Sequence, residues 1–243
     1  MRIALLSDIH GNLVALEAVL RDLETESPDA VICLGDVVVT GPQPRQVIAA
    51  LQELHWPIVL GNTDAWLFDP QPWTANNEET QRLLEVELWS ALQLVAEDLA
   101  FLHSFRPTIT RELGRDQSLL CYHGSPRDNT DFIGPMTTVE ELEIMLGDYE
   151  ATIMAGGHTH QQMLRRYQSS LLVNPGSVGM PFQVINGQSL NPLWAEYALI
   201  SSVNGKLQVD FRRIPIDLAE LREAVVASGM PHADWWLKDW RNG

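Results

Sequence analysis

The chain has 243 residues, of which 45% are apolar and 20% are charged, and its formal net charge is −16. The length suits one large domain, and the ordinary globular composition excludes a disordered or repetitive chain. A surface this acidic repels phosphate backbones, so broad nucleic-acid binding is not expected.

Three short apolar runs alternate with helical patterns in the first part of the chain. The runs cover residues 2–7, 30–34 and 57–60, and helices are predicted over about 12–24 and 44–54. The runs are continuously apolar, as in strands that are buried on both faces. This β-α-β-α-β pattern predicts an α/β fold. Each run is followed by a polar residue, at the strand end where such sheets bind ligands.

The middle of the chain does not continue this alternation. Residues 65–76 are rich in Trp, Pro and Asn and predict a loop, and Asn76 with Glu79 forms a capping pair for a helix over about 77–103, a break being left open. The apolar stripe of that helix is Leu84, Leu88, Leu92, Val95, Leu99 and Leu102. Its other face carries Glu78, Glu79, Glu85, Glu87, Glu97 and Asp98. We interpret these acidic residues as a solvated face.

The strand pattern resumes at residues 118–122 and continues at 152–155 and 171–173. A helix is predicted over about 138–146, because Thr138 and Glu141 have the spacing of a capping box. The third run leads into Asn174-Pro175-Gly176-Ser177, which is interpreted as a turn near the ligand-binding end of the strands.

The last part of the chain predicts a hairpin and a helix. Strands are expected over 195–202 and 206–214, around the turn Asn204-Gly205, and a helix is expected to begin near Asp217, which has capping-box spacing to Glu220. The apolar tail over 235–240 is expected either to pack on the domain or to form an oligomer contact.

The polar residues that follow the strands form one ordered series. In chain order they are Asp8-Ile9-His10, Gly35-Asp36, Gly61-Asn62-Thr63-Asp64, His123-Gly124 and Gly157-His158-Thr159-His160. Each motif alone is weak, because a Gly-Asp pair or a lone histidine is common at a turn. Five such motifs, each after an apolar run, indicate a metal site, because carboxylates, imidazoles and amides are metal ligands.

Nothing in the sequence indicates a membrane protein. No apolar run approaches the roughly 20 residues of a membrane-spanning helix, and the apolar part of the N-terminus is too short for a signal peptide. Cys33 and Cys121 lie inside apolar runs and are predicted to be small core residues. We therefore expect a cytoplasmic protein with no membrane partner, and a homo-oligomer is left open.

The ordered series resembles the calcineurin-like metallophosphoesterase superfamily, and among its members the small prokaryotic phosphodiesterases. The resemblance covers about residues 1–180 and rests on a combination of motifs that is highly specific. It implies an α/β fold, a four-layer α-β-β-α sandwich of two mixed sheets. It also implies a single domain over 1–243 with a helical insertion over about 65–117 near the mouth of the site, which we expect to restrict substrate size.

The resemblance also implies two divalent metal ions and their ligands. Asp8, His10 and His160 would hold the first ion, Asn62, His123 and His158 the second, and Asp36 would bridge the two. Two cations about 3.5–4 Å apart lower the pKa of a shared water, and the resulting hydroxide attacks phosphorus. Mn²⁺ is the expected metal, with Fe, Ni, Co and Zn²⁺ left open.

Asp36, Asn62 and Asp64 are the candidate catalytic residues. For Asp64 a second interpretation stays open, namely a carboxylate that positions its neighbours or caps a helix. His55, His103 and His232 lie outside the motifs and are predicted to be structural. Arg127 is either a phosphate contact or a surface residue.

Two departures from the family pattern bear on the substrate. Many members carry histidine where this chain has Thr63, and threonine cannot act as an acid near neutral pH. Protein phosphatases and dinucleoside tetraphosphatases of the family carry arginine where this chain has Leu60. A phosphodiesterase that acts on a small phosphorylated or nucleotide-like substrate is therefore preferred. A phosphomonoesterase or nucleotide pyrophosphatase, and a non-catalytic binding scaffold, remain as alternatives.

Overall fold

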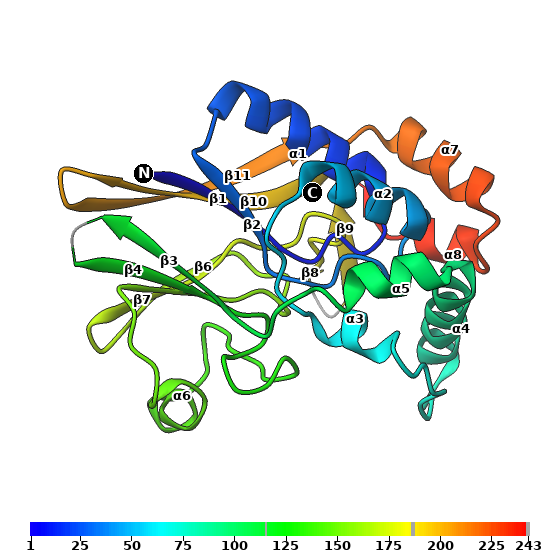
Figure 1. Ribbon diagram of the computed structural model, residues 1–243. Coiled ribbons are helices and arrows are strands. Elements are labelled where there is room, and N and C mark those ends of the chain that lie inside the picture. Colours follow the sequence, from blue (N-terminus) through cyan, green and yellow to red (C-terminus); the bar gives the residue numbers. More distant parts are fainter. Residues whose placement is uncertain (115, 186–187, 242–243) are drawn as a thin grey trace.

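The computed structural model describes residues 1–114, 116–185 and 188–241. Figure 1 shows two stacked sheets with helices above and below them. The first sheet has the strand order β11-β10-β1-β2. In it, β1 (Arg2–Leu6) and β2 (Ala30–Cys33) are parallel, whereas β10 (Trp194–Val203) is antiparallel to both β1 and β11 (Lys206–Pro215). The two predicted N-terminal strands and the predicted hairpin around Asn204 are confirmed.

The second sheet has the strand order β3-β4-β5-β7-β6. Its parallel centre consists of β4 (Gln117–Cys121), β5 (Ile153–Ala155) and β7 (Ser170–Asn174), which confirms three predicted strands. The edges β3 (Ile109–Gly114) and β6 (Met163–Tyr167) are antiparallel to their neighbours. Both edges escaped prediction, because polar residues interrupt their apolar pattern.

Helices cover the outer faces of both sheets. The first sheet packs against α1 (Leu13–Glu26), α2 (Pro44–Leu54) and α7 (Leu218–Ser228), and the second against α6 (Val139–Leu146) (Figure 1). A third apolar layer lies between the sheets and contains the buried, free Cys121. The predicted four-layer sandwich of two mixed sheets is confirmed, and Cys33 and Cys121 are core residues as expected.

The helix predicted over 77–103 is two helices, α4 (Glu78–Gln93) and α5 (Ala96–Leu102). Between them Leu94 and Val95 are extended, and Asp98 accepts a hydrogen bond from the Val95 backbone N–H at 3.0 Å. Leu92 of the predicted stripe is 83% exposed. It lies in the last turn of α4, which ends at Gln93, where the chain changes direction.

Two further details of that region differ from prediction. The N-cap of α4 is Asn77, paired with Thr80, rather than Asn76 with Glu79. The acidic residues do not form one solvated face, since Asp98 is buried and pairs with Arg45. The predicted helical insertion over 65–117 is wrong at its C-terminal end, where residues 109–114 form β3. Residue 115 lies outside the described residues.

The predicted third strand is reduced to two isolated bridges. Ile58 pairs with Cys33 beside β2, and Val59 pairs with Arg106. This segment connects the edge of the first sheet to the chain that enters β3, and it ends at Gly61, the N-cap of the short helix α3 (Asn62–Trp66). The pairing therefore places Asn62 at the same end of the sandwich as the residues after β1 and β2.

The C-terminal tail packs on the domain. Trp236 of α8 (Ala233–Leu237) and Trp240 of β12 (Trp240–Arg241) are buried in the core beneath the helices of the first sheet. β12 pairs with β9 (Gln188–Pro192), which forms a hairpin with β8 (Gln183–Ile185). Of the two predicted roles of the tail, packing on the domain is therefore the one observed.

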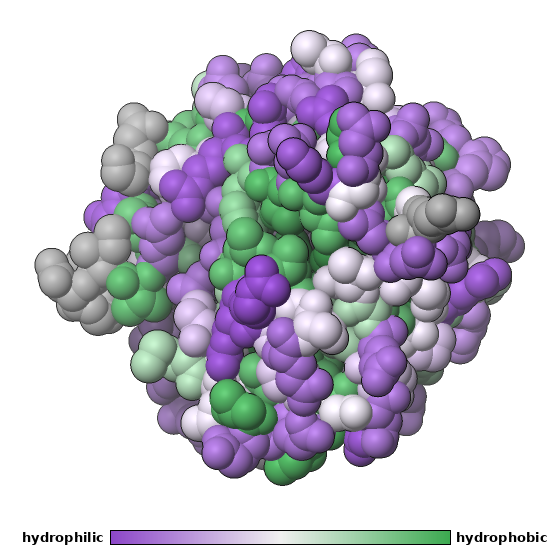
Figure 2. All heavy atoms as spheres, turned by 90° about the vertical axis from the view of Figure 1, so that its left-hand side faces the viewer, coloured by the Kyte–Doolittle hydropathy of each residue, from purple (hydrophilic) through white to green (hydrophobic). Residues whose placement is uncertain are grey.

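The end of the sandwich that lies away from the polar motifs is open to solvent. Figure 2 views this end and shows apolar surface gathered in its upper middle, framed by hydrophilic side chains. Partly buried side chains of the layer between the sheets, such as Leu171, Leu207 and Val209, come from the strand ends on this side. The polar motifs all lie at the other end, where β1, β2, β4 and β5 finish.

Candidate metal centre

The loops after four strands and the start of α3 bring all seven predicted ligands together. Metal-ligating atoms of Asp8, His10 and His160 lie within 4.8 Å of one another, and so do those of Asp36, His123 and His158. Asn62 joins the second group, since its Oδ1 lies 2.9 Å from both His123 Nε2 and His158 Nδ1. We call these seven residues the metal cluster.

Asp36 connects the two groups. Its Oδ2 lies 3.3 Å from His123 Nε2 and 3.9 Å from His10 Nε2, so one carboxylate oxygen faces both. Its other oxygen accepts a hydrogen bond from the Thr63 backbone N–H at 2.9 Å. This geometry suits a carboxylate that is shared by two ions.

The backbone of the metal cluster is strained. Asp8, His10, Asp36, His158 and His160 all have positive φ values, between 47° and 66°. Residues other than glycine seldom adopt this left-handed region, and each instance costs of order 1 kcal/mol. Five instances in one cluster indicate a functional site, because the surrounding fold must hold each of them against its local preference.

Backbone carbonyls orient three of the imidazole rings. The Nδ1 atoms of His10, His123 and His160 lie 2.9, 2.8 and 2.7 Å from the carbonyl oxygens of Val39, Leu34 and Met180, respectively. A carbonyl oxygen can only accept, so each Nδ1 must donate its proton. Each Nε2 is therefore directed at the cluster, in the tautomer that a metal ligand needs.

The cluster concentrates acceptor atoms that lack donors. The Nε2 atoms of His10 and His160 lie 3.0 Å apart. Asp8 Oδ1 is buried, and its nearest partner is His160 Nε2 at 3.3 Å, in a geometry too poor for a regular hydrogen bond. The Asn62 amide group lies 2.9 Å from an imidazole nitrogen of His123 and of His158 and 3.3 Å from Asp36 Oδ2, and without an ion its NH2 group is the one that suits these acceptors. Such a set is stable only around positive charge, supplied by protons on the histidines or by metal ions, so the residues fit a metal pair.

The pKa values of the cluster reflect how closely its charged and polar groups are packed. Burial opposes the charged form of His123, but the Asp36 carboxylate raises the pKa of His123 to about 9. Burial would raise the pKa of Asp36, yet His123 and His10 hold that pKa well below its usual range. Burial and the neighbouring His160 lower the pKa of His10. Metal binding must therefore displace protons from this cluster.

Asp64 lies behind the cluster and contacts backbone only. It is fully buried, and its two carboxylate oxygens accept hydrogen bonds from the N–H groups of Asp36 at 2.8 Å and Val37 at 2.9 Å. Burial and the Asp36 carboxylate raise the pKa of Asp64 to about 7. These contacts favour the positioning interpretation of Asp64 over direct participation in proton transfer.

Two glycines allow the loops to approach this closely. A Cβ atom on Gly61 would overlap the Asp36 side chain, and one on Gly157 would overlap the Ser7 hydroxyl and lie 2.8 Å from Asp8 Oδ2. The glycines of the Gly-Asn and Gly-His motifs are therefore required by space rather than by turn geometry, since neither has a positive φ.

The predicted turn over 174–177 borders the site. Ser177 Oγ donates to the Asp8 carbonyl at 2.8 Å and accepts from the Met180 N–H at 2.8 Å. Met180 in turn holds the His160 ring, and Phe182 lies beside that ring with a centroid distance of 5.4 Å. Neither Ser177 nor Phe182 was predicted as a site residue; only the loop motif around Ser177 signalled it.

The remaining candidates lie outside the cluster. Arg127 forms an ion pair with Asp148, in agreement with the surface interpretation. His103 stacks on Phe68, and His232 pairs with Glu85 at 2.6 Å. His55 ends α2 with a positive φ.

One side chain of the helical insertion is affected by the charge of the cluster. Glu87 of α4 is half-buried and accepts a hydrogen bond from Trp73 Nε1 at 2.7 Å. Burial raises the pKa of Glu87, and the Asp36 carboxylate raises it further. No sequence signal had separated Glu87 from the other acidic residues of α4.

Comparison with known proteins gives consistent matches. The sequence profile of the calcineurin-like phosphoesterase superfamily domain matches residues 1–189. An uncharacterised protein from Methanocaldococcus jannaschii is 26% identical over 256 residues, which span 97% of this chain and 95% of the relative.

Two solved structures match almost the whole chain. A metallophosphoesterase from Sphaerobacter thermophilus is 25% identical with a TM-score of 0.76, covering 98% of this chain and 97% of that one. A hypothetical protein from Pyrococcus horikoshii OT3 is 20% identical with a TM-score of 0.79, covering 98% and 96%. Within the described residues, no helix has both the length and the apolar character that crossing a membrane requires.

Proposed function

Because the chain belongs to the calcineurin-like phosphoesterase superfamily, we propose that it hydrolyses phosphodiesters with two divalent metal ions. The observation that carries the proposal is the metal cluster, in which potential ligand atoms of seven side chains converge in two adjacent groups. Two bound cations would lower the pKa of a water molecule and neutralise charge on phosphoryl oxygens. A non-catalytic scaffold has no need of such a strained and complete ligand set.

The seven residues of the metal cluster are divided between two ions. In this proposal Asp8, His10 and His160 hold one ion, and Asn62, His123 and His158 hold the other. Asp36 is shared, because its Oδ2 faces both groups. Mn²⁺ is the metal that we propose. Because a mixed nitrogen and oxygen site accepts several metals and availability decides among them, Fe, Ni, Co and Zn²⁺ are the alternatives.

Asp64 positions this machinery rather than transferring a proton. It accepts hydrogen bonds from the backbone N–H groups of Asp36 and Val37 on the inner side of the cluster, and a third from the Gly61 N–H at 3.4 Å, which caps α3. Preorganised groups of this kind need no reorganisation when charge develops during the reaction.

The leaving group must depart without strong acid catalysis. Thr63 occupies the position where many members of the family carry a histidine, and its hydroxyl has a pKa far too high to donate a proton near neutral pH. We therefore propose that diesters with good leaving groups, such as aryl or nucleotide-like esters, are preferred over simple alkyl esters. The substrate is a small phosphorylated compound in the cytoplasm.

The helical insertion is proposed to restrict substrate size. Support comes from the chain order, because the insertion begins directly after α3, whose first residue Asn62 belongs to the metal cluster, and Glu87 lies on the first long helix of the insertion. Trp73, which donates to Glu87, belongs to the same segment. Replacing Trp73 with Ala should increase turnover of bulky diesters relative to small ones. An unchanged ratio would remove this idea.

The first test is an assay with bis-p-nitrophenyl phosphate and p-nitrophenyl phosphate, in EDTA and after Mn²⁺ is restored. We expect metal-dependent turnover with preference for the diester. Asp36→Asn should reduce that turnover by about a hundredfold or more, because the shared ligand loses its charge. The exposed Asp69→Asn is the matched control.

Two outcomes would contradict the proposal in different ways. Preference for the monoester would favour a phosphomonoesterase or a nucleotide pyrophosphatase on the same site. A protein that binds no Mn²⁺ and turns over neither ester would favour the binding scaffold.

A further inference from the structure

A second candidate site lies at the edge of the sandwich, away from the metal cluster. It is a surface pocket of about 340 Å³ between the end of α2, the end of α5 and the first residues of β3. His55, Trp56, Phe101, Arg106 and Arg111 line it, together with smaller apolar and polar groups. We call it the Arg106 pocket. Its volume is within the range of small-molecule sites.

The Arg106 pocket carries positive charge on an acidic protein. No Asp or Glu lines it, whereas the whole chain has a net charge of −16. Among the described residues, neither Arg106 nor Arg111 forms an ion pair, unlike Arg2, Arg45, Arg82, Arg127, Arg212 and Arg213. Two guanidinium groups without acidic partners in one pocket can form forked hydrogen bonds to a phosphate.

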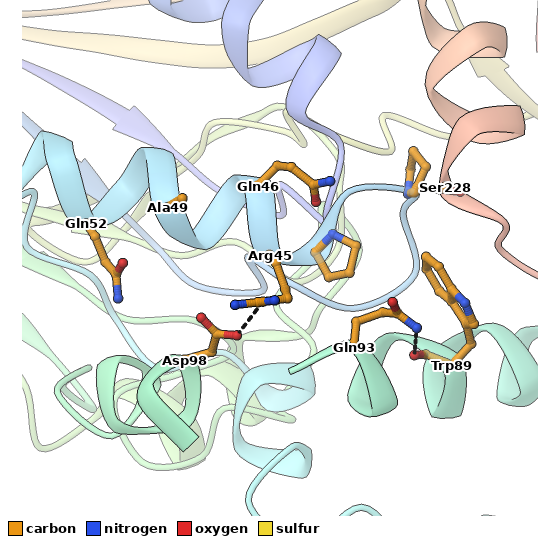
Figure 3. Close-up of a pocket in the computed structure, with 10 residues that line it drawn as sticks. Arg45, Gln46, Ala49, Gln52, Trp89, Gln93, Asp98 and Ser228 are labelled. Atoms are coloured by element: carbon orange, nitrogen blue, oxygen red, sulfur yellow. Dashed lines mark hydrogen bonds and ion pairs between the residues drawn. The ribbon is translucent and has the colours of Figure 1, made fainter. Parts of the chain in front are cut away.

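The larger pocket of the molecule lacks this property. It has a volume of about 550 Å³ and lies between α2 and α4, and Figure 3 shows its lining. There the Arg45 guanidinium already pairs with Asp98 at 2.9 Å, and the other lining residues, such as Gln46 and Gln93, are uncharged (Figure 3). The two pockets therefore differ in that the arginine of the larger one is already paired with a carboxylate, whereas, among the described residues, those of the Arg106 pocket are not.

Aromatic side chains supply the other half of the Arg106 pocket. Trp56 is half-buried against the core, and Phe101 packs edge-on against Phe105 with a centroid distance of 5.2 Å. These contacts fix the rings without covering them, since both Trp56 and Phe101 keep part of their surface exposed. Aromatic rings next to arginines are suited to stack on a heterocyclic base.

The backbone that carries these groups is rigid. The Arg106 N–H donates to the Ile58 carbonyl at 3.1 Å, and its carbonyl accepts from the Leu60 N–H at 2.8 Å. Arg111 lies in β3, two residues after Ile109, so both project on the same face of the strand. Glu112 projects on the opposite face, which keeps its carboxylate away from the pocket.

We propose that the Arg106 pocket binds a small phosphorylated aromatic ligand of the mononucleotide class, with its phosphate on Arg106 and Arg111 and its base against Trp56 and Phe101. The pocket shares no residue with the metal cluster. Arg106 pairs with Val59, three residues before Asn62, which corresponds to roughly 10 Å of extended chain. Because the two sites have no residue in common, nucleotide binding can be tested separately from the proposed hydrolysis.

The test is an equilibrium titration of the full chain with adenosine monophosphate, followed by tryptophan fluorescence and calorimetry. Excess EDTA prevents binding to metal ions, and a repeat with Mn²⁺ identifies any contribution of the metal cluster. We expect the nucleotide to bind more tightly than either inorganic phosphate or adenosine. The double variant Arg106→Gln/Arg111→Gln should weaken nucleotide binding at least about tenfold, because two charge-assisted contacts are lost.

Matched variants test whether a loss of nucleotide binding is specific to the Arg106 pocket. Arg166→Gln/Arg222→Gln removes the same charge from two exposed arginines elsewhere and should leave nucleotide affinity unchanged. Trp56→Leu should reduce the preference for the nucleotide over inorganic phosphate, and Trp56→Phe should restore it. Thermal unfolding of each variant shows that the fold is retained.

Four outcomes would overturn the proposal. Nucleotide binding that is unchanged in the arginine double variant would place the ligand elsewhere. Adenosine binding as tightly as the nucleotide would exclude a phosphate contact, and inorganic phosphate binding as tightly would exclude the aromatic contact. Absence of nucleotide binding in both EDTA and Mn²⁺ would exclude the site.

Discussion

Single residues that never face the substrate decide whether the metal cluster can form. Asp64 is the clearest case, because its carboxylate holds the N–H groups of Asp36 and Val37 in a fully buried position. Asp64→Ala should lower the free energy of unfolding by about 2–5 kcal/mol, because two buried N–H groups lose their acceptor. Asp64→Asn keeps one acceptor oxygen, so its free energy of unfolding should fall by less. Denaturant unfolding measures both.

Kinetics of the same variants separate positioning from proton transfer. If Asp64 positions Asp36, Asp64→Asn in saturating Mn²⁺ should keep most of the wild-type kcat and need more Mn²⁺ to reach it. A variant that is stable, binds metal normally and has no turnover would instead show that Asp64 transfers a proton.

Gly61 is the second residue on which the site depends. Gly61→Ala would place a methyl group against the Asp36 side chain, where the structure leaves no room. We expect destabilisation of about 1–3 kcal/mol and weaker Mn²⁺ binding, measured by unfolding and by metal titration. Gly114→Ala is the control, since the nearest atom to its added Cβ is a Ser202 hydroxyl at 3.3 Å. Equal effects of the two substitutions would contradict the spatial argument.

At the scale of elements, Asp98 is one of the side chains that connect the insertion to the sandwich. Asp98 caps α5 through the Val95 N–H and pairs with Arg45 of α2 at 2.9 Å. Asp98→Ala should cost about 1–2 kcal/mol, mostly from the lost cap, because half-exposed ion pairs contribute little. Thermal unfolding should show this loss, while Glu97→Ala, one residue earlier and exposed, should show none. A loss in both variants would mean that general helix propensity, not the cap, is responsible.

At the scale of the whole molecule, metal ions and the fold should stabilise each other. The cluster buries Asp8, Asp36, His10 and His123 at one end of the sandwich beside the partly buried His158 and His160, and their loops come from strands of both sheets. Ions that bind only the folded state at a hundred times Kd stabilise it by about 2.7 kcal/mol. For a chain of this size that corresponds to roughly 5–10 °C in Tm.

Scanning calorimetry in EDTA and in Mn²⁺ measures this difference. Asp36→Asn is the internal control, because weaker metal binding should shrink the gap between the two conditions. A Tm that is the same in both conditions for the wild type would contradict the metal site itself.

Local sequence indicated the residues that converge in the candidate metal cluster and determined most of the secondary structure. The strands before Asp8, Asp36 and His123 are continuous apolar runs, and the cap of α6 at Thr138 depends on residues three positions apart. Such signals are local, so they can be read without the fold. Five motifs in one order were also specific enough to indicate the family, which the comparison with known proteins confirmed.

Tertiary structure decided what depends on residues far apart in the chain. β3 is a strand because it pairs with β4, and α4 ends before Leu94 because Asp98 reaches both Val95 and the distant Arg45. The carbonyls that orient the histidines carry no sequence signal, since every residue has one. The Arg106 pocket likewise exists only because residues 57–60 lie beside 104–109. Contacts across such separations follow from packing, which no local pattern encodes.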